Sequence, residues 1–252
     1  MIGKTEFTIN KLLGLGRGKP APSPGRIVAT YSIFNTVDLL YDSLTSVARY
    51  VDEIRLYDGR FLDYACPCAK DHDNSCDDTM KEVEQWMREY PNAPPVIIRQ
   101  WPASLEMDKR SRMMQDVPEG DVVLVIDDDE LLIGRPEPIR EFAQTKPDWF
   151  AYVDFLFAGA GHGSGVPIPL ARLFVSTPRL RYESYYRLLD EKGLLVDMKS
   201  DNLNVPYGRR KPGRVYIDPS VRMVELWEGY RNKDRDKSRA AYNSLISKRG
   251  WR

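Results

Sequence analysis

The sequence has little that would place it in a membrane or on nucleic acid. None of its apolar runs approaches the ~18 residues that cross a bilayer, and its N-terminus, MIGKTEFTINKLLGLGRG, lacks the apolar core of a secretion signal. Lys plus Arg and Asp plus Glu both number 37, so the formal net charge is zero. The chain therefore has no strong overall charge that would attract nucleic acid or lipid. We expect a cytoplasmic protein that binds no nucleic acid.

Cysteine and histidine are also scarce. All three cysteines and one of the two histidines lie in the stretch CPCAKDHDNSC. This spacing has two interpretations: a structural zinc ion held by Cys66, Cys68, His72 and Cys76, or a loop with reduced, unligated thiols. Its C-x-C step is tighter than the C-x2-C step that is usual in zinc sites, which favours the loop.

The two ends of the chain differ from its middle. Residues 1–25 include the proline-rich stretch KPAPSPGR, which indicates an extension or linker. Residues 232–252 are predicted to form a basic helix. Either end offers a peripheral membrane contact, because FTINKLLGL is weakly amphipathic and the basic helix includes aromatic residues. The alternative for the basic helix is that its apolar stripe packs on the domain.

The middle of the chain alternates between strand and helix patterns. Apolar, β-branched runs predict strands at 26–31, 53–59, 96–101 and 122–126, and helical spacing predicts helices at 36–50, 79–90 and 105–115. This alternation predicts a parallel sheet flanked by helices. The remainder is more β-rich and aromatic, with a helix at 136–144 and strand-like segments at 149–159, 169–183 and 213–226. We expect residues 169–183 to form a hairpin or a pair of strands joined near Thr177.

Four adjacent carboxylates end the most apolar strand, in VVLVIDDDEL. On an extended segment Asp127 and Asp129 point the same way, so they can share one Mg²⁺ or Mn²⁺ with a diphosphate. The alternative is a solvated acidic loop. Ligands of open α/β sheets bind beyond the carboxyl ends of the strands, so we expect this cluster to lie near the turn at Asp58 and Gly59.

Three cations occupy the helix that precedes the acidic strand: Lys109, Arg110 and Arg112. A helix packed on the sheet can bring one or two of them to the same rim, where they would pair with phosphates or with a carboxylate. The alternative is a solvated helical face.

The segment EMDKRSRMMQDVPEGDVVLVIDDDELL resembles family 2 glycosyltransferases, in which a basic helix with an arginine leads into a strand ending in D-x-D. ATY, YDG and NSCDDTMKEVEQW also resemble that family, and PLARLFVSTPRLRYES resembles its R-x-F-x-x-x-P-x-x-R-Y-E stretch more weakly. The resemblance implies a single α/β domain of the GT-A type, with a Rossmann-like, mostly parallel sheet flanked by helices. Its nucleotide-sugar-binding half would span 26–131, and a more β-rich acceptor-binding half would span 132–231.

The resemblance also implies a function and a set of site residues. The function is metal-dependent, inverting transfer of a sugar from a nucleotide-diphosphate donor to a glycan, lipid or protein acceptor, with Mn²⁺ or Mg²⁺. The backbone near Thr30 and Tyr31 would line the base of the nucleotide, and Asp58, followed by Gly59, would bind it. Arg110, Asp127 and Asp128 would lie near the nucleotide or its phosphates. Asp127 and Asp129 would hold the metal.

The sequence departs from the family pattern in two places. The insert between Asp58 and Thr79 is long, and Glu225 and Trp227 stand where a distal histidine is expected. Inverting transfer needs a general base within reach of the acceptor hydroxyl, and the candidates are Asp154, Glu183, Asp190 and Glu225. Two alternatives stay open: a nucleotidyltransferase that acts on a sugar phosphate, and a non-catalytic, zinc-stapled binding protein with a degenerate transferase fold.

Overall fold

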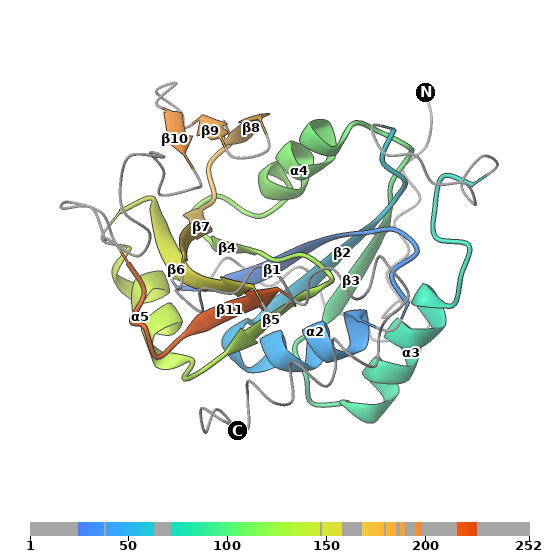
Figure 1. Ribbon diagram of the computed structural model, residues 1–252, viewed down its shortest axis with the longest axis horizontal. Helices are drawn as coiled ribbons and strands as arrows, with labels where there is room; N and C mark the ends of the chain where they lie inside the picture. The colour runs from blue at the N-terminus through green and yellow to red at the C-terminus, as the bar shows by residue number, and fades with distance from the viewer. Residues whose placement is uncertain are drawn as a thin grey trace.

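The main body of the molecule is a sheet of eight strands, in the order β3-β2-β1-β4-β7-β6-β11-β5 (Figure 1). The computed structural model describes residues 25–37, 39–62, 72–146, 148–157, 168–178, 180–184, 187–189, 195–197 and 216–225. Within these ranges no helix is long and apolar enough to cross a membrane.

The first half of the sheet is parallel, as the alternating pattern predicts. β1 (Ile27–Ile33) lies between β2 (Glu53–Asp58) and β4 (Val122–Val125), and β3 (Val96–Gln100) follows β2 at the edge. The connections run through α2 (Leu40–Val47) with the short 3-10 helix Ala48–Tyr50, through α3 (Thr79–Glu89), and through α4 (Glu106–Gln115). Every residue of β1 and β2 is buried, because helices cover both faces.

The second half of the sheet is mixed. β7 (Ile168–Val175) runs antiparallel to both β4 and β6 (Phe150–Phe157), so β6 points the same way as β4. β11 (Arg222–Glu225) is parallel to β6 and antiparallel to β5 (Glu130–Ile133), and α5 (Glu137–Thr145) joins β5 to β6. The carboxyl ends of β1, β2, β4, β6 and β11 therefore share one edge of a mostly parallel sheet.

Residues 169–183 form two strands, as predicted, but these do not pair with each other as a hairpin. β7 pairs with β4 on one side and β6 on the other, so neither of its edges is open to a further strand. β8 (Arg181–Ser184) pairs instead with β9 (Arg187–Leu189), which pairs with β10 (Leu195–Asp197) in a separate sheet.

The helices form two layers around the large sheet (Figure 1). α2, α3 and α5 cover one face, where Leu44, Trp86 and Phe142 belong to the larger apolar core. α4 and the small sheet cover the other face, where Met114 and Tyr182 belong to a second core. α4 therefore packs against β1 with one side and against β8 with another.

A buried lysine ties α4 to the carboxyl edge of the sheet. Lys109 is fully buried, and its Nζ donates hydrogen bonds to the carbonyl oxygens of Ile33 at 3.2 Å and Gly59 at 2.6 Å. Nζ also lies 4.6 Å from the centre of the Phe61 ring. Burial lowers the pKa of Lys109 to about 7, although the negative charge of Asp58 opposes that shift. Because one side chain holds the ends of two strands, α4 fixes the rim where ligands of such sheets bind.

Substituting Gly134 tests how closely β5 and β11 are joined. Gly134 has φ +105°, and a Cβ there would lie 1.8 Å from the carbonyl oxygen of Ser220, whereas Gly120, with φ +85°, has nothing within 4 Å. Both Gly→Ala changes strain the backbone, but only Gly134→Ala adds a clash. We expect Gly134→Ala to lower the free energy of unfolding by about 1–3 kcal/mol more than Gly120→Ala in urea titrations. Equal losses would contradict this account.

The buried lysine makes stability depend on pH in a defined direction. Its pKa is about 7 in the folded state and 10.5 ordinarily, so between these values the unfolded state binds more protons and stability rises with pH. We expect the wild type to gain up to ~1.4 kcal/mol per pH unit over Lys109→Met between pH 7 and 9, measured by urea unfolding. Lys81→Met, on the exposed face of α3, should follow the wild type. Parallel curves for the wild type and Lys109→Met would show that the lysine is not forced toward neutrality.

Candidate functional site

The acidic stretch after β4 is a turn rather than an extended segment. β4 ends at Val125, the Glu130 amide donates to the Asp127 carbonyl at 3.1 Å, and the Asp127 amide donates to Oε2 of Glu130 at 2.8 Å. The expectation that Asp127 and Asp129 point the same way because the chain is extended is therefore wrong. Glu130 instead closes the turn on itself, which holds four carboxylates in a short loop at the rim.

Two arginines neutralise this acidic turn. Arg110 from α4 lies 2.8 Å from a carboxylate oxygen of Asp127, and Arg172 from β7 lies 3.7 Å from the other. Arg172 also forms a close ion pair with Glu130, and Arg110 forms one with Glu106 at 2.6 Å. Burial favours the neutral form of Asp127, but the two guanidinium charges outweigh it and hold the pKa of that carboxyl below its usual value.

The other carboxylates of the turn are less well compensated. Burial raises the pKa of Glu130 well above its usual value, opposed by Arg172, and burial together with the charge of Asp127 raises the pKa of Asp128. Asp129 is partly exposed. Within the described ranges, no three His, Cys, Asp or Glu side chains converge as a ready metal-ligand set. The carboxylates are hard oxygen donors that suit Mg²⁺ or Mn²⁺, but substrate phosphate oxygens would need to complete such a shell.

Asp58 stands at the same edge, at the end of β2. Its carboxylate accepts hydrogen bonds from the Ser75 amide at 3.0 and 3.2 Å and from the Ser75 hydroxyl at 2.6 Å. A carboxylate has about four acceptor positions, so Oδ2 keeps capacity for one more donor. Burial raises the pKa of Asp58, while the Ser75 bonds oppose that shift. Gly59 cannot carry a side chain, because a Cβ would lie 2.6 Å from the Trp101 carbonyl oxygen.

Asp58 and the acidic turn are neighbours, as predicted. β1 lies between β2 and β4 and pairs with both, and the Lys109 ammonium interacts electrostatically with both Asp58 and Asp128. Of the three cations on α4, the structure brings Lys109 and Arg110 to this edge, whereas Arg112 is exposed on the outer face.

Thr30 and Tyr31 lie inside the sheet, and Thr30 is in register with Val125, the last residue of β4. β1 continues to Ile33, two residues beyond the predicted end of the strand, so both are fully buried within the sheet. The Thr30 carbonyl accepts the Ile126 amide at 3.3 Å, and the Tyr31 hydroxyl lies 3.1 Å from the Ser43 hydroxyl. The first polar residues beyond the carboxyl end of this strand are Asn35 and Thr36.

The loop after β1 is tied to the end of the long insert. Asn35, with φ +52°, receives and gives hydrogen bonds across this junction: its amide donates to Ser75 Oγ at 2.9 Å, and its Oδ1 accepts the Cys76 amide at 2.8 Å. The Thr36 amide donates to Thr79 Oγ1 at 2.8 Å. Cys66 and Cys68 lie outside the described residues, so the zinc set that they would form with His72 and Cys76 stays a prediction.

Of the candidate general bases, Glu225 lies at the carboxyl edge and Asp154 lies three residues before the end of β6. Asp154 pairs in register with Arg222, and Glu225 pairs with both Phe157 and Glu130, which places Glu225 at the rim next to the acidic turn. Both side chains are partly buried. Glu183 lies on β8, but its side chain and all of Asp190 fall outside the described residues.

Arg172 and Tyr182 belong to this cluster although neither was predicted as a site residue. Arg172 is ion-paired to the turn, and the Tyr182 phenol interacts electrostatically with Arg110, Arg172 and Asp127. The only sequence signal for them is that both occur in the stretch resembling R-x-F-x-x-x-P-x-x-R-Y-E. That motif does not predict which residues Arg172 and Tyr182 contact in the fold.

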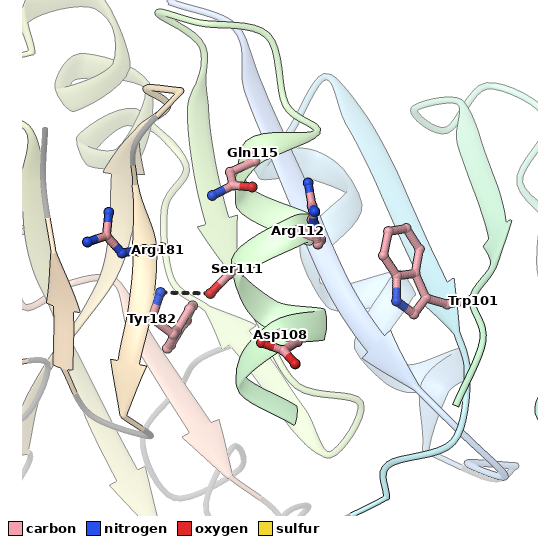
Figure 2. Close-up of a pocket in the computed structure, with 7 residues that line it drawn as sticks. All are labelled: Trp101, Asp108, Ser111, Arg112, Gln115, Arg181 and Tyr182. Atoms are coloured by element: carbon pink, nitrogen blue, oxygen red, sulfur yellow. Dashed lines mark hydrogen bonds between the residues drawn. The ribbon is translucent and has the colours of Figure 1, made fainter. Parts of the chain in front are cut away.

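A groove of about 590 Å³ opens on the outer side of α4. Figure 2 shows its lining, which comes from α4, from β8 and from the residue after β3: Trp101, Asp108, Ser111, Arg112, Gln115, Arg181 and Tyr182. The Tyr182 amide donates to Ser111 Oγ at 2.9 Å, which fastens β8 to the helix. Asp58 and the acidic turn do not line this groove, so Tyr182 is the residue shared by the groove and the charged cluster.

No protein-family model and no curated protein matches this chain. Solved structures of GT-A glycosyltransferases do match it. S. aureus TarS 1-349 in complex with UDP matches with a TM-score of 0.40 and 17% identity over 55% of this chain and 37% of that one. The mannosyltransferase PcManGT from Pyrobaculum calidifontis in complex with GDP-Man and Mn2+ matches with a TM-score of 0.38 and 15% identity over 57% and 41%.

The chain thus spans 37% and 41% of the lengths of these two matched structures. They belong to the family that the sequence motifs resemble.

Proposed function

We propose that this chain is a GT-A-type glycosyltransferase that moves a sugar from a nucleotide-diphosphate donor to an acceptor with the help of a divalent cation. One observation carries the proposal. Asp58, the acidic turn and its two arginines stand at a single carboxyl edge of a mostly parallel sheet, where such folds bind their ligands. An acceptor-only carboxylate, hard oxygen donors and guanidinium groups together suit a base, a cation and phosphates.

Asp58 is the proposed contact for the nucleotide base. The base of a nucleotide presents N–H donors, and the remaining acceptor capacity of Oδ2 can take one of them. Hydrogen bonds from the Ser75 amide and hydroxyl hold the carboxylate in place, so little ordering is left to do when a ligand binds. Asn35 and Thr36 follow the carboxyl end of β1, so their side chains are better placed to line the base than the buried side chains of Thr30 and Tyr31.

Asp129 is the proposed principal ligand of the cation. It is partly exposed on the acidic turn and is the second aspartate of the D-x-D pattern. A bound Mg²⁺ or Mn²⁺ would offset the charge that develops on the leaving diphosphate. The role of the turn is to hold the carboxylates at the rim before the ligand arrives, through the bond between the Asp127 amide and Glu130.

Glu225 is the proposed general base. Its register opposite Phe157 and Glu130 places it at the rim, whereas Asp154 lies three residues deeper on the paired strands. Within reach of the site, a carboxylate can take the proton of the acceptor hydroxyl as the new bond forms.

A nucleoside diphosphate with Mn²⁺ should stabilise the protein against heat. At 100 times Kd, a ligand adds about 2.7 kcal/mol, which raises Tm by about 5–10 °C for a chain of this size. We expect Asp129→Ala to remove the Mn²⁺-dependent part of the shift, and Asp108→Ala, on the exposed face of α4, to keep it. A panel of nucleotides that gives no shift with or without Mn²⁺ would exclude the proposal. Release of pyrophosphate from a nucleoside triphosphate and a sugar phosphate would indicate nucleotidyl transfer instead.

Glu225→Gln should separate binding from turnover. It keeps the shape of the side chain and removes the base, so we expect the nucleotide-induced thermal shift to persist while donor turnover falls at least ~100-fold. Asp154→Asn is the matched comparison. Loss of turnover in Asp154→Asn with full turnover in Glu225→Gln would assign the role to Asp154.

A further inference from the structure

The charged cluster contains two buried donors without acceptors. Tyr182 and Arg172 are 7% and 8% exposed, yet within the described residues the Tyr182 hydroxyl and the Arg172 Nε have no hydrogen-bond partner. A buried donor that has lost water and gained no partner costs stability. Two such donors in one cluster therefore point to an acceptor that is supplied from outside the chain.

The two donors belong to the same small space. Burial raises the pKa of Tyr182 to about 12, while the positive charges of Arg110 and Arg172 oppose that shift, so both guanidinium groups act on its phenol. At neutral pH the hydroxyl is protonated and able to donate. Arginine offers only donors, so neither arginine can accept a hydrogen bond from the Tyr182 hydroxyl.

Asp127 occupies the position beside the two arginines that an anionic ligand would take. Its side chain is more accessible than that of Glu130, with 24% exposed against 2%. It is close to Arg110 at 2.8 Å but only loosely paired with Arg172 at 3.7 Å. One carboxylate has two oxygens, whereas a phosphate group offers more acceptors and up to two negative charges. A phosphate can therefore satisfy donors that Asp127 leaves unmet.

We propose that Arg110, Arg172 and Tyr182 form a binding site for a phosphate group, which Asp127 fills as counter-ion in the ligand-free protein. A phosphate that enters would accept from the Tyr182 hydroxyl and from both guanidinium groups and would release Asp127 from the arginines. The proposal rests on the proposed function for the identity of the anion, a donor diphosphate, and deepens it by adding Arg172 and Tyr182 to the ligand contacts.

A purely structural role for the cluster makes the opposite prediction for Tyr182→Phe. If the hydroxyl stabilised the fold, its removal would lower the free energy of unfolding. Since the hydroxyl has no partner among the described residues, we expect Tyr182→Phe to leave that free energy unchanged or to raise it. Anion affinity and stability then move independently, which a structural role does not allow.

The test is calorimetric titration of inorganic pyrophosphate into the full-length protein with EDTA present at low ionic strength. We expect Tyr182→Phe to bind at least about tenfold more weakly than the wild type, because it loses one hydrogen bond to a charged group. Arg172→Lys should also weaken binding, because it keeps the charge but loses the guanidinium fork. Arg88→Gln, on the exposed side of α3, and Tyr90→Phe, at the exposed residue that follows α3, serve as matched controls and should bind like the wild type.

Pyrophosphate that binds equally to the wild type and Tyr182→Phe would overturn the proposed phosphate site, and so would a wild type that does not bind it. If nucleoside diphosphate with Mn²⁺ nevertheless stabilises the wild type, the proposed function stands without this site. If pyrophosphate binding needs Tyr182 but no nucleotide binds, the site stands and the proposed function fails.

Discussion

The architecture of the carboxyl edge depends on the neutralisation of one acidic turn by two arginines. Four consecutive carboxylates would repel one another if they stood alone at the end of a buried strand. Arg110 arrives from the helix before that strand, and Arg172 from a strand of the distal half, so the ion pairs join both halves of the molecule at the turn. Removing either arginine would leave buried carboxylates uncompensated, which is the costly way to break such a network.

The parallel half of the sheet could be predicted because its signals are local. Each strand there is a short apolar run, each helix has its own periodicity, and topology then requires that Asp58 and the acidic turn meet at one edge. The same reasoning predicted that one or two of Lys109, Arg110 and Arg112 would reach that edge, because a helix packed on the sheet can present some of its side chains to the rim. These predictions needed no knowledge of distant contacts.

The distal half could not be predicted in the same way. β5 is only four residues long and begins within the acidic stretch, so it resembles the continuation of a loop. β7 and β8 look like two arms of a hairpin in the sequence, but the partners of β7 are β4 and β6. Whether Asp127 lies in a strand or a turn depends on Glu130 and on Arg172, which is more than 40 residues away. Such contacts leave no periodic trace in the sequence.

The position of β5 has a consequence for the order in which the chain folds during synthesis. β5 begins at Glu130, the last residue of the acidic turn, and its strand partner in the described sheet is β11, which ends at Glu225. Some ninety residues must therefore leave the ribosome before the strand that follows the turn can pair. Until then the nascent chain holds a completed parallel half beside an edge whose carboxylates have no fixed arrangement. The arrangement of the carboxyl edge is thus completed late in the synthesis of this protein.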